Sequence, residues 1–252
     1  MKPIYRSLIV RNSLLAAVML QQTACSKDKE YNASNLIPKT LFLFSASVDS
    51  VPADGATEVM LTASGFPINT EDSGNSVAFT TDYGTFLSTG ANSATVPWTY
   101  VYLPNDSLER IATIFLHGTI IPDTAHLMAA VNGVTAPKSL YFYRAYPDLM
   151  YILPSSLFVR TSDSAGIAIT VDLVRHSGAV SLYTPVSLVV RNNSGASVGA
   201  FSIYQNLCDS SGRCLFQYVF QDTSYTGTLS VIAQVGNNPP VLSDTLTMTV
   251  VP

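Results

Sequence analysis

The sequence predicts an all-β protein made of two tandem β-sandwiches. The first observation is a series of short runs in which apolar and polar residues alternate, such as EVMLTASG at 58–65 and GIAITVDLV at 166–174. Glycine, asparagine, proline and aspartate separate these runs, which is typical of strands joined by turns. The second observation is that the two halves of the chain resemble each other. The third is that no amphipathic helical period follows the first 24 residues.

The N-terminal 24 residues have the order of a cleaved export signal. Three basic residues come first, the apolar run SLLAAVML follows at 13–20, and the small pair Thr23 and Ala24 ends the segment. A positive region, a short apolar region and a small-residue processing site are the parts of such a signal. The apolar run is much shorter than the roughly 20 residues that a membrane-spanning helix needs. No later run approaches that length, so we expect no membrane span in the mature chain.

Cys25 stands directly after that small pair, followed by SKDKE. The stretch TAC resembles the lipobox of bacterial lipoproteins, although Gln22 stands where the lipobox usually has leucine. SKDKE resembles the surface-export signal of Bacteroidota lipoproteins. The resemblance implies that Cys25 is acylated, becomes the new N-terminus and holds the protein in the outer membrane, facing the cell exterior. Three acyl chains anchor far more firmly than one. The alternative is a plain secreted protein with a chance cysteine.

The two halves align over most of their length. ERIATIFLHGTIIPDTAHLMAAVNG at 109–133 lies over GRCLFQYVFQDTSYTGTLSVIAQVGN at 212–237, with a strand, a polar turn and a strand in each. Similarity at a spacing of a little over 100 residues indicates two tandem domains. Their border near 146–150 is short, aromatic and free of glycine, which favours stiff coupling. The predicted organisation is a signal peptide at 1–24, lipidated cysteine and tether at 25–40, and domains at 41–147 and 148–252.

The first domain carries a resemblance to a known fold family. VPADGATEVMLTASG at 51–65, followed by SVAFTTDYGTF at 76–86, resembles bacterial Ig-like domains of the invasin and intimin type. The second domain keeps VSLVV and GAF but lacks the Ala-Asp-Gly turn. The resemblance implies two Greek-key sandwiches, each of about seven strands, and a role in surface display or adhesion. Likeness of fold does not by itself establish that role.

Two cysteines remain after Cys25, and they flank a short turn. If Asp209 pairs with Arg213, then Ser210, Ser211 and Gly212 form a three-residue hairpin loop, with glycine where a positive φ is required. Cys208 and Cys214 are then the next cross-strand pair, within disulfide reach. A redox or metal-binding pair is the alternative, but neither histidine nor a third thiol accompanies them. We expect a structural disulfide, which the exported location permits.

Several classes of function have no support in the composition or motifs. Removing residues 1–24 takes away three positive charges and no acid, so the net charge changes from −4 to −7. An acidic chain without a basic cluster argues against a nucleic-acid partner. His117, His126 and His176 stand in separate strands or turns, and no nucleophile, phosphate-loop or metal motif occurs. We therefore predict no enzyme, no cofactor and no metal, although folding could still bring two carboxylates together.

PWTYVYLP at 97–104 contains the candidate ligand-contact residues. Alternation places Trp98, Tyr100 and Tyr102 on one face of a strand and Thr99, Val101 and Leu103 on the other, and either face could be the core. Buried aromatics are the simpler interpretation. An exposed aromatic stripe would instead mark a contact site for a glycan, a matrix component or a partner protein. The function hypotheses are thus a surface binding or adhesion module, a structural spacer, or an accessory lipoprotein of a nutrient-uptake system; the sequence does not indicate an oligomeric state.

Asp-Ser and Asp-Thr triplets form a second surface feature. Exported Bacteroidota proteins carry O-linked glycans at such pairs when a small or aliphatic residue follows, and composition alone would give roughly one or two of them. Aspartate before serine or threonine is also an ordinary turn former, which is the alternative. The five candidate acceptors are Ser50, Ser107, Thr124, Ser164 and Thr245.

Overall fold

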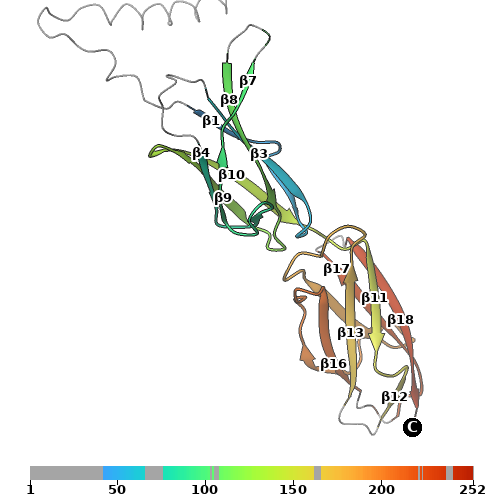
Figure 1. Cartoon of the computed structure of the whole chain (residues 1–252). Helices are drawn as coiled ribbons and strands as arrows, with labels where there is room; N and C mark the ends of the chain where they lie inside the picture. Colours follow the sequence, from blue (N-terminus) through green and yellow to red (C-terminus); the bar gives the residue numbers. More distant parts are fainter. Residues whose placement is uncertain are drawn as a thin grey trace, which may run out of the picture. The chain divides into compact units, whose positions relative to one another are not determined.

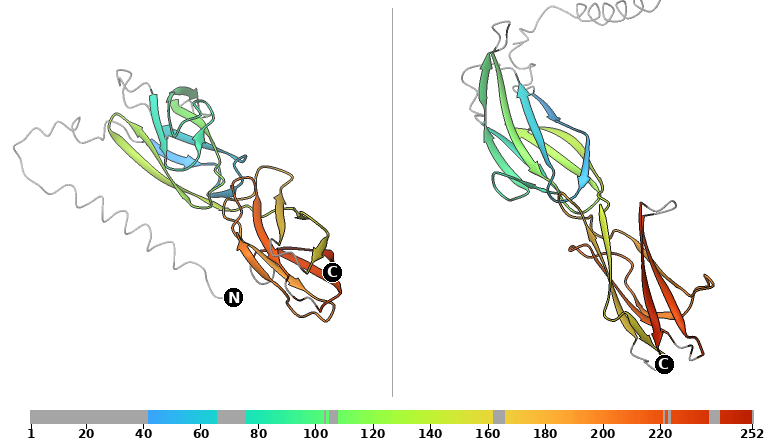
Figure 2. Two further views of the ribbon diagram at one scale, coloured as in Figure 1. Left: turned by 90° about the horizontal axis from the view of Figure 1, so that it is seen from below. Right: turned by 90° about the vertical axis from the view of Figure 1, so that its right-hand side faces the viewer.

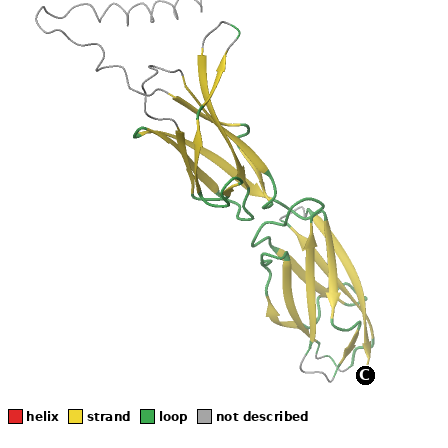
Figure 3. Cartoon of the chain, viewed as in Figure 1, coloured by secondary structure: helices red, strands yellow, loops and turns green. Residues whose placement is uncertain are grey.

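The computed structural model of the chain describes residues 42–65, 76–102, 104, 108–161, 166–220, 222, 224–236 and 241–251. Cys25, Ser107 and Ser164 lie outside these residues. Every regular element in the described ranges is a β-strand (Figure 3), and among them no helix is long and apolar enough to span a membrane.

The first sandwich packs two sheets face to face (Figure 1). The order within each sheet differs from the order along the chain, so the chain crosses repeatedly between the layers. One sheet contains β1 (Phe42–Ala46), β3 (Glu58–Gly65), β8 (Leu108–His117) and β5 (Thr85–Phe86), with β7 (Thr99–Tyr102) also paired to β8. The other contains β2 (Ser50–Ala53), β10 (Val134–Arg144), β9 (Thr124–Val131), β4 (Ser76–Thr81) and β6 (Ser93–Pro97).

The second sandwich also has two sheets, which the turned views separate clearly (Figure 2). One contains β11 (Leu149–Pro154), β13 (Ile167–Val174), β16 (Arg213–Val219) and β15 (Ala200–Tyr204). The other contains β12 (Phe158–Arg160), β18 (Leu242–Val251), β17 (Gly227–Val235) and β14 (Val186–Arg191). The prediction of an all-β chain with two sandwiches is confirmed.

The internal repeat corresponds to equivalent strands. The two aligned segments begin with β8 and β16, and these strands pair with β3 and β13, respectively. β5 and β15, which each begin directly after a glycine, Gly84 and Gly199, pair on the other side of β8 and β16. The first sandwich has in addition β6 and β7, for which the described part of the second has no counterpart. This extra segment contains the predicted contact residues.

Alternation along each strand decides which side chains enter the core. On β3, Val59, Leu61 and Ala63 are fully buried, as predicted, whereas Met60 points outward and is exposed. Full burial of a large apolar side chain contributes about 1.5–3 kcal/mol, so a sandwich holds its sheets together through many such residues. The largest buried side chains of the two cores include Phe79, Phe86, Phe142, Phe216, Tyr218, Leu229 and Met248.

The predicted disulfide between Cys208 and Cys214 is present, with 4.5 Å between the Cα atoms. The Asp209 amide donates to the Arg213 carbonyl at 2.9 Å, and the Gly212 amide donates to the Asp209 carbonyl at 3.0 Å. Gly212 has a φ of +77°, and a Cβ there would lie 2.6 Å from a backbone oxygen, so the turn requires glycine. Because both cysteines are fully buried in the second core, the bridge is part of its packing.

Hydrogen bonds cross between the two sandwiches at a buried serine. β10 ends at Arg144 and β11 begins at Leu149, so the connecting segment is short. The Ser181 hydroxyl accepts a hydrogen bond from the Ala145 amide at 2.8 Å and donates one to the Ala53 carbonyl at 2.7 Å. Ser181 is inaccessible to solvent. These bonds support the expected stiff coupling of the domains.

Asp54 is the buried charge at the same junction. Burial by itself raises the pKa of Asp54, but hydrogen bonds from the Ala56 and Thr57 amides and the Thr57 hydroxyl, together with the charge of Arg175, outweigh burial and hold the pKa below its usual value. A carboxylate with a lowered folded-state pKa stabilises the fold at neutral pH, and this contribution is lost as the pH falls below about 4.

Candidate functional site

The β7–β8 arm, formed by residues 99–102 and 108–111, is the part of the first sandwich that carries exposed aromatic side chains. β7 pairs with β8 from Thr99 opposite Ile111 to Tyr102 opposite Leu108. The two strands extend as a ribbon beyond their neighbours in the sandwich (Figure 1). Every residue of β7 is exposed, with Tyr100 at 55% and Tyr102 at 78%. The arm therefore presents two tyrosines at a position where neither contributes to the core.

Trp98 does not belong to this exposed group, so the expectation that alternation places all three aromatic residues on one face does not hold. Its side chain is only 9% exposed and packs in the first core. The reason is that alternation is interrupted at this residue. β6 ends at Pro97 in one sheet and β7 begins at Thr99 in the other, so Trp98 occupies the crossover and its ring turns inward. Of the two interpretations of residues 97–104, burial in the core applies to Trp98, and exposure to solvent applies to Tyr100 and Tyr102.

Arg110 fixes the base of the arm. Its guanidinium carbon lies 4.9 Å from the centroid of the Trp98 ring, and the residue is only 2% exposed. Its Nε and Nη2 atoms have no hydrogen-bond partner among the described residues. A cation–π contact contributes about 2 kcal/mol or more when it is desolvated. Arg110 stands opposite Tyr100 in the β7–β8 register. The exposed Tyr100 therefore lies directly beside the buried contact between Arg110 and Trp98.

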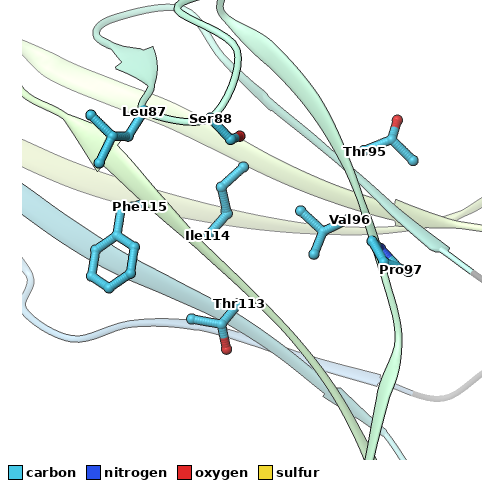
Figure 4. Close-up of a pocket in the computed structure, with 8 residues that line it drawn as sticks. All are labelled: Leu87, Ser88, Thr95, Val96, Pro97, Thr113, Ile114 and Phe115. Carbon is cyan, nitrogen blue, oxygen red and sulfur yellow. The ribbon is translucent and has the colours of Figure 1, made fainter.

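A mainly apolar opening of about 410 Å³ lies between β6 and β8 (Figure 4). Val96 on β6 and Ile114 on β8 face it from two strands, and Leu87 and Phe115 lie at one side. β7 pairs with β8 only as far as Ile111, and β5 pairs with it only from Leu116. Among the described strands, none covers this side of β8 between those points. The opening therefore adjoins the β7–β8 arm, and the protein surface next to the arm is mainly apolar.

The described acceptor candidates for glycans lie near the surface. Ser50 and Thr245 are exposed, and Thr124 is half-buried. The Asp123 carboxylate accepts a hydrogen bond from the Thr124 amide at 2.7 Å, and that of Asp244 accepts one from the Thr245 amide at 2.8 Å. Such local bonds are typical of aspartate in turns, but they leave the threonine hydroxyls uninvolved. Glycosylation at these residues stays a prediction.

The three histidines remain apart in the structure. His117 is on β8 and His126 on β9, where the His126 ring lies 2.7 Å from the Asp82 carboxylate. His176 follows β13 and lies 3.1 Å from Asp148. In the described ranges, no three histidine, cysteine, aspartate or glutamate residues are grouped so that they could hold a metal ion.

Comparison with known proteins relates the fold to bacterial adhesins. No protein-family model matches the sequence, and no curated protein is significantly similar to it. Among solved structures, the adhesin InvE of Yersinia pseudotuberculosis aligns with a TM-score of 0.50 and 17% identity, covering 83% of this chain and 58% of its own. Invasin, described as a bacterial integrin-binding protein, aligns with a TM-score of 0.57 and 16% identity, covering 83% of this chain and 39% of its own.

The present chain thus spans less than two thirds of the length of either adhesin. At these identities the likeness concerns the fold, and activity does not follow from fold alone. The expected similarity to invasin-type domains is confirmed at that level: the chain consists of Ig-like β-sandwich domains that resemble those of bacterial adhesins.

Proposed function

We propose that this protein is a non-catalytic binding module displayed on the cell surface, and that its β7–β8 arm contacts the ligand. The observation that carries the proposal is the exposure of Tyr100 and Tyr102 on a ribbon that extends beyond its sandwich. Tyrosine is enriched among the residues that dominate binding energy, because it offers a large apolar face and a hydroxyl at little conformational cost. The ligand classes that suit such side chains are a glycan, a matrix component or a partner protein.

Replacing both Tyr100 and Tyr102 by alanine is expected to abolish attachment while leaving stability nearly unchanged. Substitutions at exposed positions usually change the free energy of unfolding by less than about 0.5 kcal/mol, whereas loss of an aromatic contact at an interface costs about 2 kcal/mol or more. Binding of the mature chain to an array of glycans and matrix proteins, together with its thermal unfolding, measures both effects.

The matched control is the double variant Tyr141→Ala/Tyr143→Ala. These tyrosines are also two residues apart on one strand, β10, and are about half exposed, but they belong to the opposite sheet. This control should bind like the parent. If the Tyr100/Tyr102 variant retains all binding of the parent, or the parent binds nothing, the arm is not a contact site. A structural spacer, which the hydrogen bonds at Ser181 favour, would then be the better explanation.

The proposed location rests on the order of the N-terminal residues. Cys25 would carry the lipid that holds the protein in the outer membrane, facing outward, and exposed Asp-Ser/Thr pairs would carry glycans. We expect the intact mass of protein purified from its native cells to exceed that of the polypeptide from residue 25 by a lipid mass and by glycan masses. Fatty-acid labelling should disappear in Cys25→Ala, and protease added to whole cells should digest the protein. Labelling that persists in the variant, or protection from protease, would contradict the anchor or the orientation.

A further inference from the structure

The outer face of the second sandwich contains a depression that the proposed function does not use. We call it the β13 groove, and its volume is about 460 Å³. Thr170 and Asp172 on the central strand β13 form its floor. The neighbouring strands β11 and β16 contribute the two sides, and Gln205 and Asp209, whose amides donate to the Leu215 and Arg213 carbonyls, also line it next to β16.

The sheet register explains the shape of the groove. Tyr151 on β11, Asp172 on β13 and Arg213 on β16 form one row across the sheet. Leu153, Thr170 and Leu215 form the next row on the same face. The side chains on β11 and β16 stand out from the sheet, with Tyr151 49% exposed, whereas the Asp172 side chain is only 21% exposed. The polar floor therefore lies between Leu153 on one side and Arg213 and Leu215 on the other. The exposed Tyr151 does not line the groove but stands two residues before Leu153 on the same face of β11.

The charges in the groove are largely engaged within the protein. Arg213 Nε lies 3.2 Å from Asp172 Oδ1, so the two charges pair, but Asp172 Oδ1 is buried and has no hydrogen-bond partner among the described residues. The Asp209 carboxylate accepts hydrogen bonds from the Ser211 and Arg213 amides. With two carboxylates and one guanidinium, the groove offers no surplus positive charge that would attract an anion. Its polar atoms are suited instead to a ligand that both donates and accepts hydrogen bonds without a charge of its own.

We infer that the β13 groove binds a neutral saccharide, as a second site separate from the β7–β8 arm. A sugar ring has apolar C–H faces that can pack on Leu153 and Leu215 in the lining, and on Tyr151 where it borders the groove beside Leu153. Its hydroxyls can meet the polar groups of Thr170 and Asp172 on the floor. Hydroxyl groups act as donor and acceptor at once, so they can satisfy both kinds of group in one narrow site. Sites for small ligands commonly combine an apolar lining with a few polar groups of this kind.

A second sheet packed on this face would leave the same polar groups without partners. Sheets that stack on one another do so through interdigitating apolar side chains. Covering Thr170 and Asp172 with an apolar surface would remove water from a hydroxyl and a carboxylate, which is unfavourable unless new hydrogen bonds form. The composition of the floor therefore favours a hydroxyl-rich ligand over a second copy of the chain.

Titration of the isotopically labelled mature chain with neutral oligosaccharides tests this inference. The panel contains glucose, mannose and galactose oligomers at millimolar concentration, with uronic-acid oligomers as charged comparators. We expect at least one neutral oligomer to shift the backbone amide signals of Thr170, Asp172 and Leu215 saturably, more strongly than its charged counterparts. Tyr151→Ala and Thr170→Val should each weaken that binding about tenfold or more. The first removes the aromatic side chain that borders the groove, and the second removes a hydroxyl of the floor without changing its shape.

Two control variants separate this site from the arm. Tyr141→Ala, at an exposed tyrosine of the first sandwich, should bind the oligosaccharide like the parent, and so should Tyr100→Ala/Tyr102→Ala. Loss of groove binding in the arm variant would contradict the claim of a separate site. The inference is overturned if no neutral oligomer shifts the groove signals. It is also overturned if those signals shift with protein concentration alone, since that would identify the face as a contact between copies.

Discussion

Trp98→Ala is expected to destabilise the first sandwich by about 3–5 kcal/mol, enough to unfold it under conditions in which the parent stays folded. The ring is almost fully buried, so its removal leaves a large cavity. The substitution also removes the aromatic face against which the Arg110 guanidinium packs. That guanidinium would remain buried with even fewer favourable contacts, and an uncompensated buried charge is strongly unfavourable. Denaturant unfolding followed by circular dichroism measures the loss.

Trp98→Phe is the matched control for this experiment. It keeps an aromatic face beneath Arg110 and removes an indole N–H that has no hydrogen-bond partner among the described residues. We expect it to lose clearly less stability than Trp98→Ala. Trp98 is the single tryptophan of the chain, so fluorescence of the parent reports on the first sandwich, and its emission should be that of a buried indole. If Trp98→Ala unfolded at the same denaturant concentration as the parent, the Trp98 ring would not be part of the core.

Local sequence patterns predicted the strands because the information that fixes them is local. Val59, Leu61 and Ala63 alternate with polar or exposed residues, and a period of two determines which face of a strand is buried. The hairpin between Cys208 and Cys214 was predictable for the same reason, since a three-residue loop with glycine at its end fixes which residues pair.

The crossover at Trp98 could not be predicted in this way. Alternation assigns a face only while the chain stays in one sheet, and between Pro97 and Thr99 it passes to the other. The sequence 97–104 shows an uninterrupted alternation that hides this change. Pro97, at the end of β6, is a residue that commonly ends strand pairing, but it does not show where the chain goes next. The pairing of Arg110 with Trp98 depends on that path and so was also missed.

The contacts at the junction depend on residues far apart in sequence, and Ser181 is the clearest example. Nothing in the stretch AVSLYTP distinguishes this serine from the many others in the chain. In the structure, it joins Ala145 in the connecting segment to Ala53 at the end of β2, 128 residues before it. Its role results from the packing of the two sandwiches, which no local pattern encodes.

Ser181→Ala is expected to weaken the coupling between the sandwiches by about 2–6 kcal/mol. The substitution leaves the Ala145 amide and the Ala53 carbonyl without this partner in a site that water does not reach, and each unsatisfied buried group costs about 1–3 kcal/mol. Hydrogen exchange at the Ala145 amide should accelerate by at least about tenfold, and thermal unfolding should begin at a lower temperature. Both effects are local to the junction, so the two cores themselves should keep their packing.

Ser187→Ala is the control for this prediction, because Ser187 lies on the exposed side of β14 in the same sandwich. It should unfold and exchange like the parent. If Ser181→Ala also behaves like the parent, the hydrogen bonds at the junction do not hold the sandwiches together. If the Ala145 amide exchanges faster in Ser181→Ala while ligand binding is unchanged, then the junction determines how stiffly the two sandwiches are connected, and it does not contribute to binding through Tyr100 and Tyr102. A binding surface of the kind proposed would benefit from that separation, since a stiff connection limits the conformational freedom lost on attachment.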